Sequence, residues 1–337
     1  MTNIFLIHTE YHLMVTVRMI VSCFCKDTNI IYYTIGRLKK EQIIETNNNG
    51  MEFKPLPAKD YGVRSTLNEM LALKPSNFIF FQDNSSDNIY LIYNFYRKHI
   101  KVSLVQDGYK PYPIWHRKHL ALVVVKETFE MYMQMIKRKA LIPSLFLRTY
   151  KYGALRYIDA LWLEYPDKLP YKTHKSLVQI PAFSQESKSL CFKLFDYQKE
   201  DGFDGSVLYV GQPLRKEYLR KKELDIISRI IKNHPNKRFV YKPHPLVSKE
   251  QLSEILNIKE VEIYGKAIPI ELLMVSMEDS IIVSPWSAAL LTYNDRCRYY
   301  WLHKMLFEEE KAQKENQMEI VNPTNHIREI ANMDEIV

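Results

Sequence analysis

Residues 238–245 have the sequence Arg-Phe-Val-Tyr-Lys-Pro-His-Pro, a short apolar segment that ends in a histidine, His244, between two prolines. The apolar residues predict a buried strand, and a strand of an open α/β sheet leads into the edge where such folds bind ligands. The prolines restrict the backbone and remove two amide donors, so the imidazole is held in a fixed direction. Because imidazole can donate a proton or a hydrogen bond near neutral pH, His244 is a candidate functional residue. A plain strand exit with an exposed histidine is the alternative.

Strands and helices alternate on both sides of this segment. In the second half we expect strands at 206–210, 238–241, 261–264 and 280–283, and helices at 222–233, 248–256, 269–277 and from 288 onward. In the first half we expect strands at 3–7, 29–34, 77–82, 101–106 and 160–164, and helices at 11–24, 66–73 and 88–98. This order predicts parallel sheets with right-handed crossovers. The proline-containing stretch 166–203 separates the halves, so we expect domains at 1–185 and 186–337.

The composition is that of an ordinary soluble protein of two domains, with 337 residues, 46% hydrophobic and 26% charged. Four cysteines lie without a paired framework, which predicts reduced thiols: Cys23, Cys25, Cys191 and Cys297. We expect Cys23 and Cys25 to be buried, because they lie in an apolar segment. No signal peptide and no membrane-spanning run is apparent, so we expect a cytoplasmic protein.

The net charge of +8 is concentrated in the basic and aromatic segment 137–157. Three interpretations remain open for this segment: a solvated helix face, docking on an anionic membrane surface, or nucleic-acid binding. No known nucleic-acid motif accompanies the charge, so a nucleic-acid partner is not expected.

Four loops that follow predicted strands carry polar residues. The first holds Asp107 beside Gly108, where a carboxylate could accept a proton from a hydroxyl; an ordinary Asp-Gly turn is the alternative. The second holds Gly211 and Gln212, where a glycine lets a ligand approach the backbone. No Gly-rich dinucleotide fingerprint and no P-loop motif is present, so this loop belongs to neither of those classes.

The other two loops offer groups for a phosphate. The third holds Lys242 and His244. The fourth holds Ser284 and Ser287 before a predicted helix, where hydroxyls and free amides suit an anion. Ordinary capping of the helix by these serines is the alternative.

The order of Asp107-Gly108, Lys242-Pro-His-Pro245 and the serines at 284–287 resembles that of bacterial sialyltransferases with a GT-B fold, which carry acidic-Gly, His-Pro and Ser-Ser/Thr motifs. Segments 5–13 and 208–214 are most similar to the lipooligosaccharide sialyltransferase family (glycosyltransferase family 52), with the bacterial polysialyltransferases as relatives. The resemblance implies an α/β protein with two Rossmann-like doubly wound domains that face a central cleft.

The resemblance also implies roles for the residues of the four loops. Asp107 would deprotonate the acceptor hydroxyl, and His244 would act as general acid on the departing CMP phosphate. The donor would be bound by residues of the second domain: Gly211, Gln212, Lys242, His244, Ser284 and Ser287. Enzymes of the resembled families invert the anomeric centre without an essential metal, and neither a metal site nor a cofactor is expected here. No Asp-x-Asp element is present in the chain.

Two positions depart from the family motifs. Gln106 stands where the first acidic residue is expected, which leaves one carboxylate in that motif, and Trp286 stands where the first serine is expected. Trp286 would either stack on the ligand or pack in the core. On the acceptor side, His8, Tyr109 and His116 are weaker candidates.

These observations favour an inverting glycosyltransferase that moves sialic acid, or a related nonulosonic acid, from a CMP donor to a hydroxyl of a lipooligosaccharide or capsule. We expect it to work at the inner face of the bacterial cytoplasmic membrane, and the resemblance suggests a homodimer. A GT-B transferase that uses a UDP-sugar or CDP-glycerol is one alternative. A catalytically silent protein that binds glycan or nucleic acid is the other. The linkage formed and the particular acceptor are not indicated.

Overall fold

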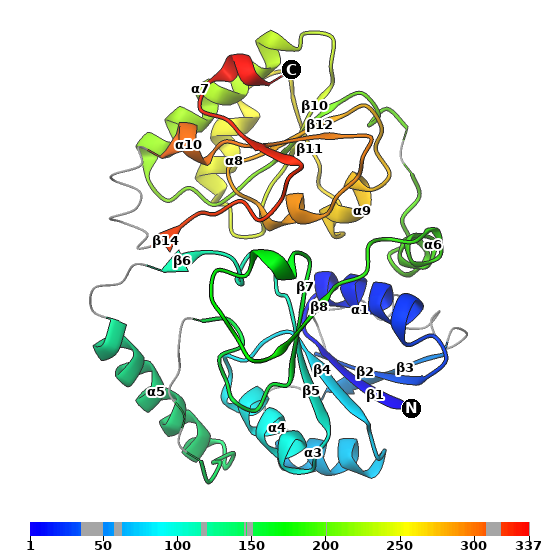
Figure 1. The fold of residues 1–337 in the computed structure, drawn as a ribbon. Coiled ribbons are helices and arrows are strands. Elements are labelled where there is room, and N and C mark those ends of the chain that lie inside the picture. The colour runs from blue at the N-terminus through cyan, green and yellow to red at the C-terminus, as the bar shows by residue number, and fades with distance from the viewer. Residues whose placement is uncertain are drawn as a thin grey trace. The chain divides into compact units, whose positions relative to one another are not determined.

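A computed structural model describes residues 1–34, 50–56, 63–115, 120–144, 146, 151–199, 201–307 and 318–336. The chain forms two compact units (Figure 1). The first comprises Met1–Pro111 and Arg117–Tyr197, and the second comprises Tyr112–His116 and Gln198–Val337. Each unit is an α/β domain built on its own parallel sheet, as the alternating pattern predicts.

The first unit contains a seven-stranded sheet in the order β3-β2-β1-β4-β5-β7-β8, in which all neighbouring strands are parallel. Its strands are β1 (Thr2–Ile7), β2 (Thr28–Thr34), β3 (Met51–Leu56), β4 (Asn77–Phe80), β5 (Lys101–Val105), β7 (Ala160–Leu163) and β8 (Ser176–Gln179). The order reverses between β1 and β4. In doubly wound sheets, the carboxyl ends of the strands at such a point are where ligands bind.

Three helices of the first unit, α1, α4 and α6, begin at a polar cap residue. Thr9 accepts a bond from the backbone amide of His12 at the start of α1, and Ser85 caps α4 in the same way. The helices are α1 (Glu10–Cys23), α3 (Val63–Ala72), α4 (Ser86–Arg97), α5 (Leu120–Lys137) and α6 (Gln185–Leu194), with a short 3₁₀ helix at Pro166–Lys168.

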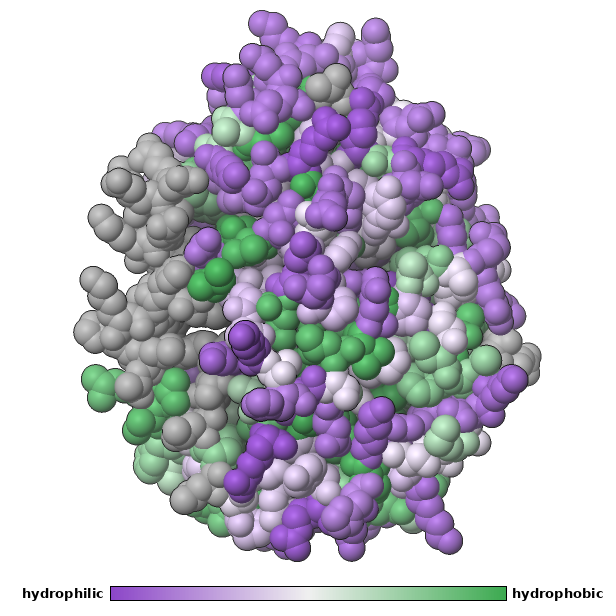
Figure 2. Space-filling model, in the orientation of Figure 1, coloured by the Kyte–Doolittle hydropathy of each residue, from purple (hydrophilic) through white to green (hydrophobic). Residues whose placement is uncertain are grey.

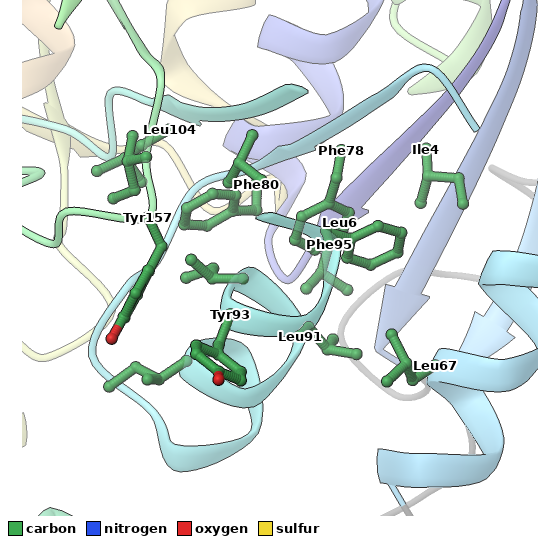
Figure 3. Close-up of a cluster of buried hydrophobic side chains, with 14 of the residues drawn as sticks. Ile4, Leu6, Leu67, Phe78, Phe80, Leu91, Tyr93, Phe95, Leu104 and Tyr157 are labelled. Carbon is green, nitrogen blue, oxygen red and sulfur yellow. The ribbon is translucent and has the colours of Figure 1, made fainter. Parts of the chain in front are cut away.

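A cluster of buried apolar side chains joins one face of this sheet to α3 and α4. Figure 3 shows side chains of β1, β4 and β5 pointing toward those of the two helices. Phe78 of β4 stacks on Phe95 of α4, with 4.2 Å between their ring centroids. Both rings are fully buried, so this contact fixes the position of α4 against the sheet.

The second unit contains a six-stranded parallel sheet in the order β11-β10-β9-β12-β13-β15. Its strands are β9 (Val207–Val210), β10 (Phe239–Lys242), β11 (Val261–Ile263), β12 (Ile281–Ser284), β13 (Arg298–Trp301) and β15 (Ile327–Glu329). The order reverses between β9 and β12, as it does between β1 and β4 in the first unit. A separate antiparallel pair is formed by β6 (Ile114–Trp115) and β14 (Met318–Glu319).

The longest helix of the second unit, α7, has an apolar face that includes Ile226, Ile227 and Ile230, all buried in the core beside the sheet. The helices are α7 (Glu217–Asn233), α8 (Lys249–Leu256), α9 (Ile270–Met274) and α10 (His303–Leu306), with 3₁₀ helices at Ala288–Leu291 and Met333–Glu335.

The stretch 166–203 contains the boundary between the units, which falls after Tyr197, but it also contains β8 and α6, and α6 packs on α1. Two expectations about local structure were wrong. The helix expected from residue 288 is a single 3₁₀ turn, Ala288–Leu291. Cys23 and Cys25 are exposed, since α1 ends at Cys23; all four cysteines are free thiols.

No described helix is both long and apolar enough to cross a membrane. Within the described part of the chain, no group of three His, Cys, Asp or Glu side chains is arranged to hold a metal ion.

Candidate functional site

Asp107 follows β5 and lies among polar groups that follow the neighbouring strands of the first unit. Its Oδ1 is 3.1 Å from Nε2 of His12, in the first turn of α1, and its Oδ2 accepts a bond of 3.2 Å from the side-chain amide of Gln82. Lys110 places its ammonium on the same Oδ2. The Asp107 side chain is 16% exposed, so one carboxylate is held by three donors and is still open to solvent.

His12 is fully buried, and its partners determine which ring nitrogen carries the proton. The backbone N–H of His8 donates to His12 Nδ1 at 3.1 Å, and an N–H group can only donate. His12 Nδ1 is therefore the acceptor, and Nε2 carries the hydrogen that is donated to Asp107. The ring stacks on Phe81 with 4.2 Å between centroids and an interplanar angle of 7°. These contacts hold the imidazole against the carboxylate in one orientation.

The same surroundings set the charges of this pair. Burial lowers the pKa of His12, in spite of the opposing effect of the hydrogen bond to Asp107. Burial alone would raise the pKa of Asp107, but the hydrogen bond from His12 and the nearby ammonium of Lys110 outweigh it and hold that pKa well below its usual range. At neutral pH the pair is thus a neutral imidazole and an ionised carboxylate.

Gln106, which replaces the first acidic residue of the motif, is a buried structural residue. Its Oε1 accepts a bond of 2.8 Å from the backbone amide of Glu164, and so ties the end of β5 to the end of β7. Glu164 in turn receives two bonds, of 2.9 and 3.1 Å, from the buried guanidinium of Arg18 on α1. An amide is suited to this position, because a carboxylate there would add a second buried negative charge beside Glu164.

The weaker candidates of the first unit are less well grouped. His8 follows β1 and shares a bond of 2.8 Å between its Nδ1 and the hydroxyl of Thr34 at the end of β2. Tyr109 is half-buried in the loop after Asp107, where Gly108 adopts a left-handed φ of 64°. His116 lies outside the described residues.

In the second unit, His244 follows β10, and the partner of its Nδ1 again determines the tautomer. The backbone N–H of Leu246 donates to His244 Nδ1 at 3.1 Å, so in the neutral ring the hydrogen is on Nε2. The side chain is half-buried, and burial lowers its pKa. His244 can therefore donate one hydrogen bond from Nε2 as a neutral group, whereas protonation would cost it the bond from Leu246.

Lys242, the last residue of β10, points toward β11. Its ammonium donates to the backbone oxygen of Lys266 at 2.5 Å and lies 5.1 Å from the ring centroid of Tyr264. These contacts engage Lys242 within the protein.

The two serines at the end of β12 differ in what they can offer a ligand. Ser284 is fully buried, donates to the backbone oxygen of Val210 at 2.7 Å and accepts from the amide of Ser287 at 2.9 Å. Its only O–H therefore joins the end of β12 to the end of β9. Ser287 accepts a bond of 3.2 Å from the amide of Ala289, which leaves its own O–H able to donate. Trp286 packs its ring against Phe307, with 5.0 Å between centroids.

Gly211 follows β9 in a position that only a glycine can occupy. A Cβ added there would lie 2.2 Å from Oη of Tyr241 on the next strand. That hydroxyl is buried and has no hydrogen-bond partner among the described residues. The backbone of the loop thus runs directly over the tyrosine, and a larger residue would displace it.

A buried amide clamp, which the sequence did not indicate, holds the loop at 211–214. Gln251 of α8 donates to the backbone oxygen of Gln212 at 3.0 Å and accepts from the amide of Leu214 at 3.0 Å. Gln251 also donates to Oε2 of Glu223 at 2.8 Å, and Tyr209 donates to Oε1 at 3.1 Å. Burial raises the pKa of Glu223 to about 7, although both hydrogen bonds act to lower it.

Each unit therefore carries a polar site at the carboxyl edge of its sheet. The first presents an ionised carboxylate that can accept a hydrogen bond or a proton. The second presents a neutral imidazole N–H, a serine O–H and a glycine-containing loop after three adjacent strands, β10, β12 and β9, which suits an anionic ligand.

The model of the alpha-2,8-polysialyltransferase family matches residues 3–295 of the chain. No curated protein matches it. The bacterial polysialyltransferases were expected as relatives, whereas membership of the lipooligosaccharide family stays a prediction.

Solved structures of bacterial sialyltransferases are similar in fold. The alpha/beta-galactoside alpha-2,3-sialyltransferase of Photobacterium phosphoreum has a TM-score of 0.57 at 12% identity, over 100% of this chain and 99% of that one. The GT-B domain of a Photobacterium damselae sialyltransferase has a TM-score of 0.54 at 14% identity, over 94% and 95%. A Photobacterium 2,6-sialyltransferase, solved with CMP and lactose, has a TM-score of 0.53 at 13% identity, over 93% and 74%. At these identities the likeness shows the fold, which is GT-B as expected.

The Glu223 clamp predicts a pH dependence of stability. A folded-state pKa of about 7 lies above the value of about 4.3 for an unfolded chain, so between these pH values only the folded protein binds the proton. The free energy of unfolding should therefore fall on the order of 3 kcal/mol as the pH rises from 4 to 8, and this part of the slope should vanish in Glu223→Gln.

Urea unfolding across this pH range measures the effect, with Glu260→Gln, at an exposed position, as the matched control. Equal slopes for Glu223→Gln and the wild-type protein would show that the pKa of Glu223 is the same in the folded and unfolded states.

Proposed function

From the premise that the chain belongs to the alpha-2,8-polysialyltransferase family, we propose how its two sites divide the reaction. The protein is a glycosyltransferase of the GT-B fold that transfers sialic acid. We propose that CMP-sialic acid is the donor and is bound by the second unit, and that the acceptor is bound by the first. The anchored carboxylate of Asp107 is the observation that carries this proposal.

In the proposed reaction, the acceptor hydroxyl attacks the anomeric carbon of sialic acid on the face opposite the phosphate. The new bond joins the acceptor oxygen to that carbon, the carbon–oxygen bond to the phosphate breaks, and CMP departs with the bonding electrons. The hydroxyl proton passes to Asp107, and the configuration inverts. A transition state of oxocarbenium character, usual for sugar transfer, needs a base only late, when the attacking oxygen has become acidic.

Lys110 gives this carboxylate a way to become a stronger base. The ammonium is half exposed and shares Oδ2 with Gln82, whereas the bond from His12 is buried. We propose that an acceptor hydroxyl takes the place of Lys110 at Oδ2. Loss of the nearby positive charge would raise the pKa of Asp107, while His12 keeps the carboxylate oriented.

For His244 the geometry supports a role different from the general acid that the resemblance implies. Its Nδ1 is occupied by the amide of Leu246, so we propose that the neutral ring donates from Nε2 to the donor phosphate. A phosphate leaving group needs no proton at neutral pH, because its second pKa is about 6. Stabilisation of the developing charge by a fixed N–H donor is sufficient for such a leaving group.

The remaining donor contacts are assigned to the loops beside His244. We propose that Ser287 donates its O–H to the phosphate, and that Gly211 and Gln212 lie against the nucleoside. Ser284 would support these residues by holding the ends of β12 and β9 together. While its ammonium stays bonded to Lys266, Lys242 would contribute only positive electrostatic potential to the donor site. It would contact the donor directly if the donor drew the ammonium away from Lys266. No cofactor is assigned.

The acceptor is proposed from the family and from the chain's charge. The family description names alpha-2,8 linkage, which points to the 8-hydroxyl of a sialic acid that ends a cell-surface glycan such as lipooligosaccharide or capsule. We propose that the enzyme works peripherally at the inner face of the cytoplasmic membrane. A homodimer also stays a proposal.

Donor choice can be tested by thermal unfolding with CMP, CDP, UDP, GDP and ADP. A ligand at about 100 times its Kd adds about 2.7 kcal/mol, which raises the melting temperature by several degrees. We expect CMP and CDP to stabilise the protein and the other nucleotides to have little effect. A preference for UDP would overturn the CMP donor, and no response to any nucleotide would favour a silent binding protein.

The Asp107→Asn variant tests the catalytic base. Asparagine keeps an acceptor for the bond from His12, so the fold and the binding of CMP should be retained. Transfer to a sialic acid-terminated oligosaccharide should fall by about 10²–10⁴-fold, the usual contribution of a general base. Transfer within a few fold of the wild-type rate would remove Asp107 from the reaction.

Two variants of His244 separate a hydrogen-bond donor from a general acid. Loss of one bond to a charged phosphate should cost His244→Ala about 10–100-fold in kcat/KM. His244→Gln can place an N–H near the position of Nε2 and should recover a substantial part of that loss. If His244 is instead a general acid, His244→Gln will be as impaired as His244→Ala, and the wild-type rate will fall as the pH rises through the histidine pKa.

A further inference from the structure

Helix α5 has two apolar faces, and only one of them is used in the fold. The inner face packs Met131 and Met135 into the core of the first unit, where both are buried. The outer face carries five apolar side chains that are 49–75% exposed: Leu122, Val125, Phe129, Met133 and Ile136. Their spacing of three and four residues places them in one line along the helix. Figure 2 shows hydrophobic side chains at the surface over α5, at the lower left.

In the sequence, positive charge is concentrated before and after this line of side chains, which we call the α5 stripe. Residues 117–158 contain nine Lys or Arg and two Glu, a net charge of +7, compared with +8 for the whole chain. Arg117 and Lys118 precede the helix, and Lys137, Arg138 and Lys139 stand at its end.

The charges also bear on what covers the stripe. Because both ends of α5 are basic, a second copy of the helix would bring like charges together in either a parallel or an antiparallel arrangement. A bilayer with an apolar interior and anionic headgroups matches both the exposed apolar side chains and the positive charge. A helix lying in the interface of an anionic bilayer buries its apolar side chains at the acyl boundary and places its Lys and Arg among the headgroups.

We propose that α5 docks the enzyme on an anionic phospholipid bilayer through the α5 stripe. The helix has 18 residues and is about 27 Å long, so the stripe extends over nearly the whole of that length. The inference rests on the proposed function only in that a glycolipid acceptor would be presented at such a surface. It deepens that proposal by naming the element that makes the contact.

The test uses the full-length protein and phosphatidylcholine vesicles with and without phosphatidylglycerol, separated by flotation. We expect the wild-type protein to float with the anionic vesicles at low salt, and to float less as salt screens the charges. The variant Leu122→Ser/Phe129→Ser should lose roughly tenfold or more in vesicle binding, because two apolar side chains no longer leave water. The variant Lys137→Glu/Lys139→Glu should lose binding and much of the salt dependence.

The matched control is Tyr218→Ser/Leu256→Ser, which replaces two large side chains of the second unit that are 53% and 54% exposed. It should bind vesicles as the wild-type protein does. Transfer to a soluble acceptor, measured in parallel, should be the same for all these proteins. If the wild-type protein binds the vesicles but shows no transfer, the result counts against the proposed function and leaves the docking helix supported.

Three results would overturn the docking proposal. The first is equal vesicle binding by the stripe variant and the control. The second is sedimentation velocity showing a wild-type dimer that the stripe variant dissociates, since α5 would then pair with a second copy. The third is binding to soluble polysialic acid, but not to anionic vesicles, which would assign the positive charge to an anionic glycan.

Discussion

The parallel order of the strands is the constraint on which both sites depend. In a parallel sheet all carboxyl ends lie at one edge, and the reversal of order after β1 and after β9 opens that edge to a ligand. The sheet ends must also be held together there, where the ladder of backbone bonds stops. Ser284 does this between β12 and β9, and Gln106 does it between β5 and β7. Both are buried polar residues, and each makes its bond between strand ends within the protein.

Each motif thus divides its work between two residues. In the first unit, Gln106 supports the strand end and Asp107 carries the charge. In the second, Ser284 supports the strand end and Ser287 keeps a free O–H. The same logic extends to the histidines, since a backbone amide occupies Nδ1 of both His12 and His244 and leaves Nε2 as the donor. A backbone amide cannot change its role with pH, so each ring has one tautomer built into the fold.

Apolar runs bounded by turn residues were sufficient to predict the strands that carry the motifs, and the family resemblance indicated the GT-B fold. The elements β8 and α6 were missed because their sequence is rich in proline, serine and lysine, and α6 is a helix chiefly through its capping box and its contact with α1. The contacts of His12 and Gln82 with Asp107 and the clamp formed by Gln251 could not be predicted, because they depend on tertiary contacts between residues distant in sequence. Gln251 is a single buried polar residue in α8, a helix of largely polar sequence, so its burial leaves no periodic pattern in the sequence.

The pairing of β6 with β14 imposes a delay on the chain as it is made. Segment 112–116 interrupts the first unit but belongs to the second, and its partner strand follows some 200 residues later. At 5–20 residues per second, a ribosome needs roughly 10–40 s to reach β14 after it has completed β6. During that time the parts of the first unit on both sides of segment 112–116 can fold, while β6 is still without its partner strand β14. Folding during synthesis therefore cannot proceed strictly one domain after the other, because β6, in the early half of the chain, can pair only after β14, in the late half, has been made.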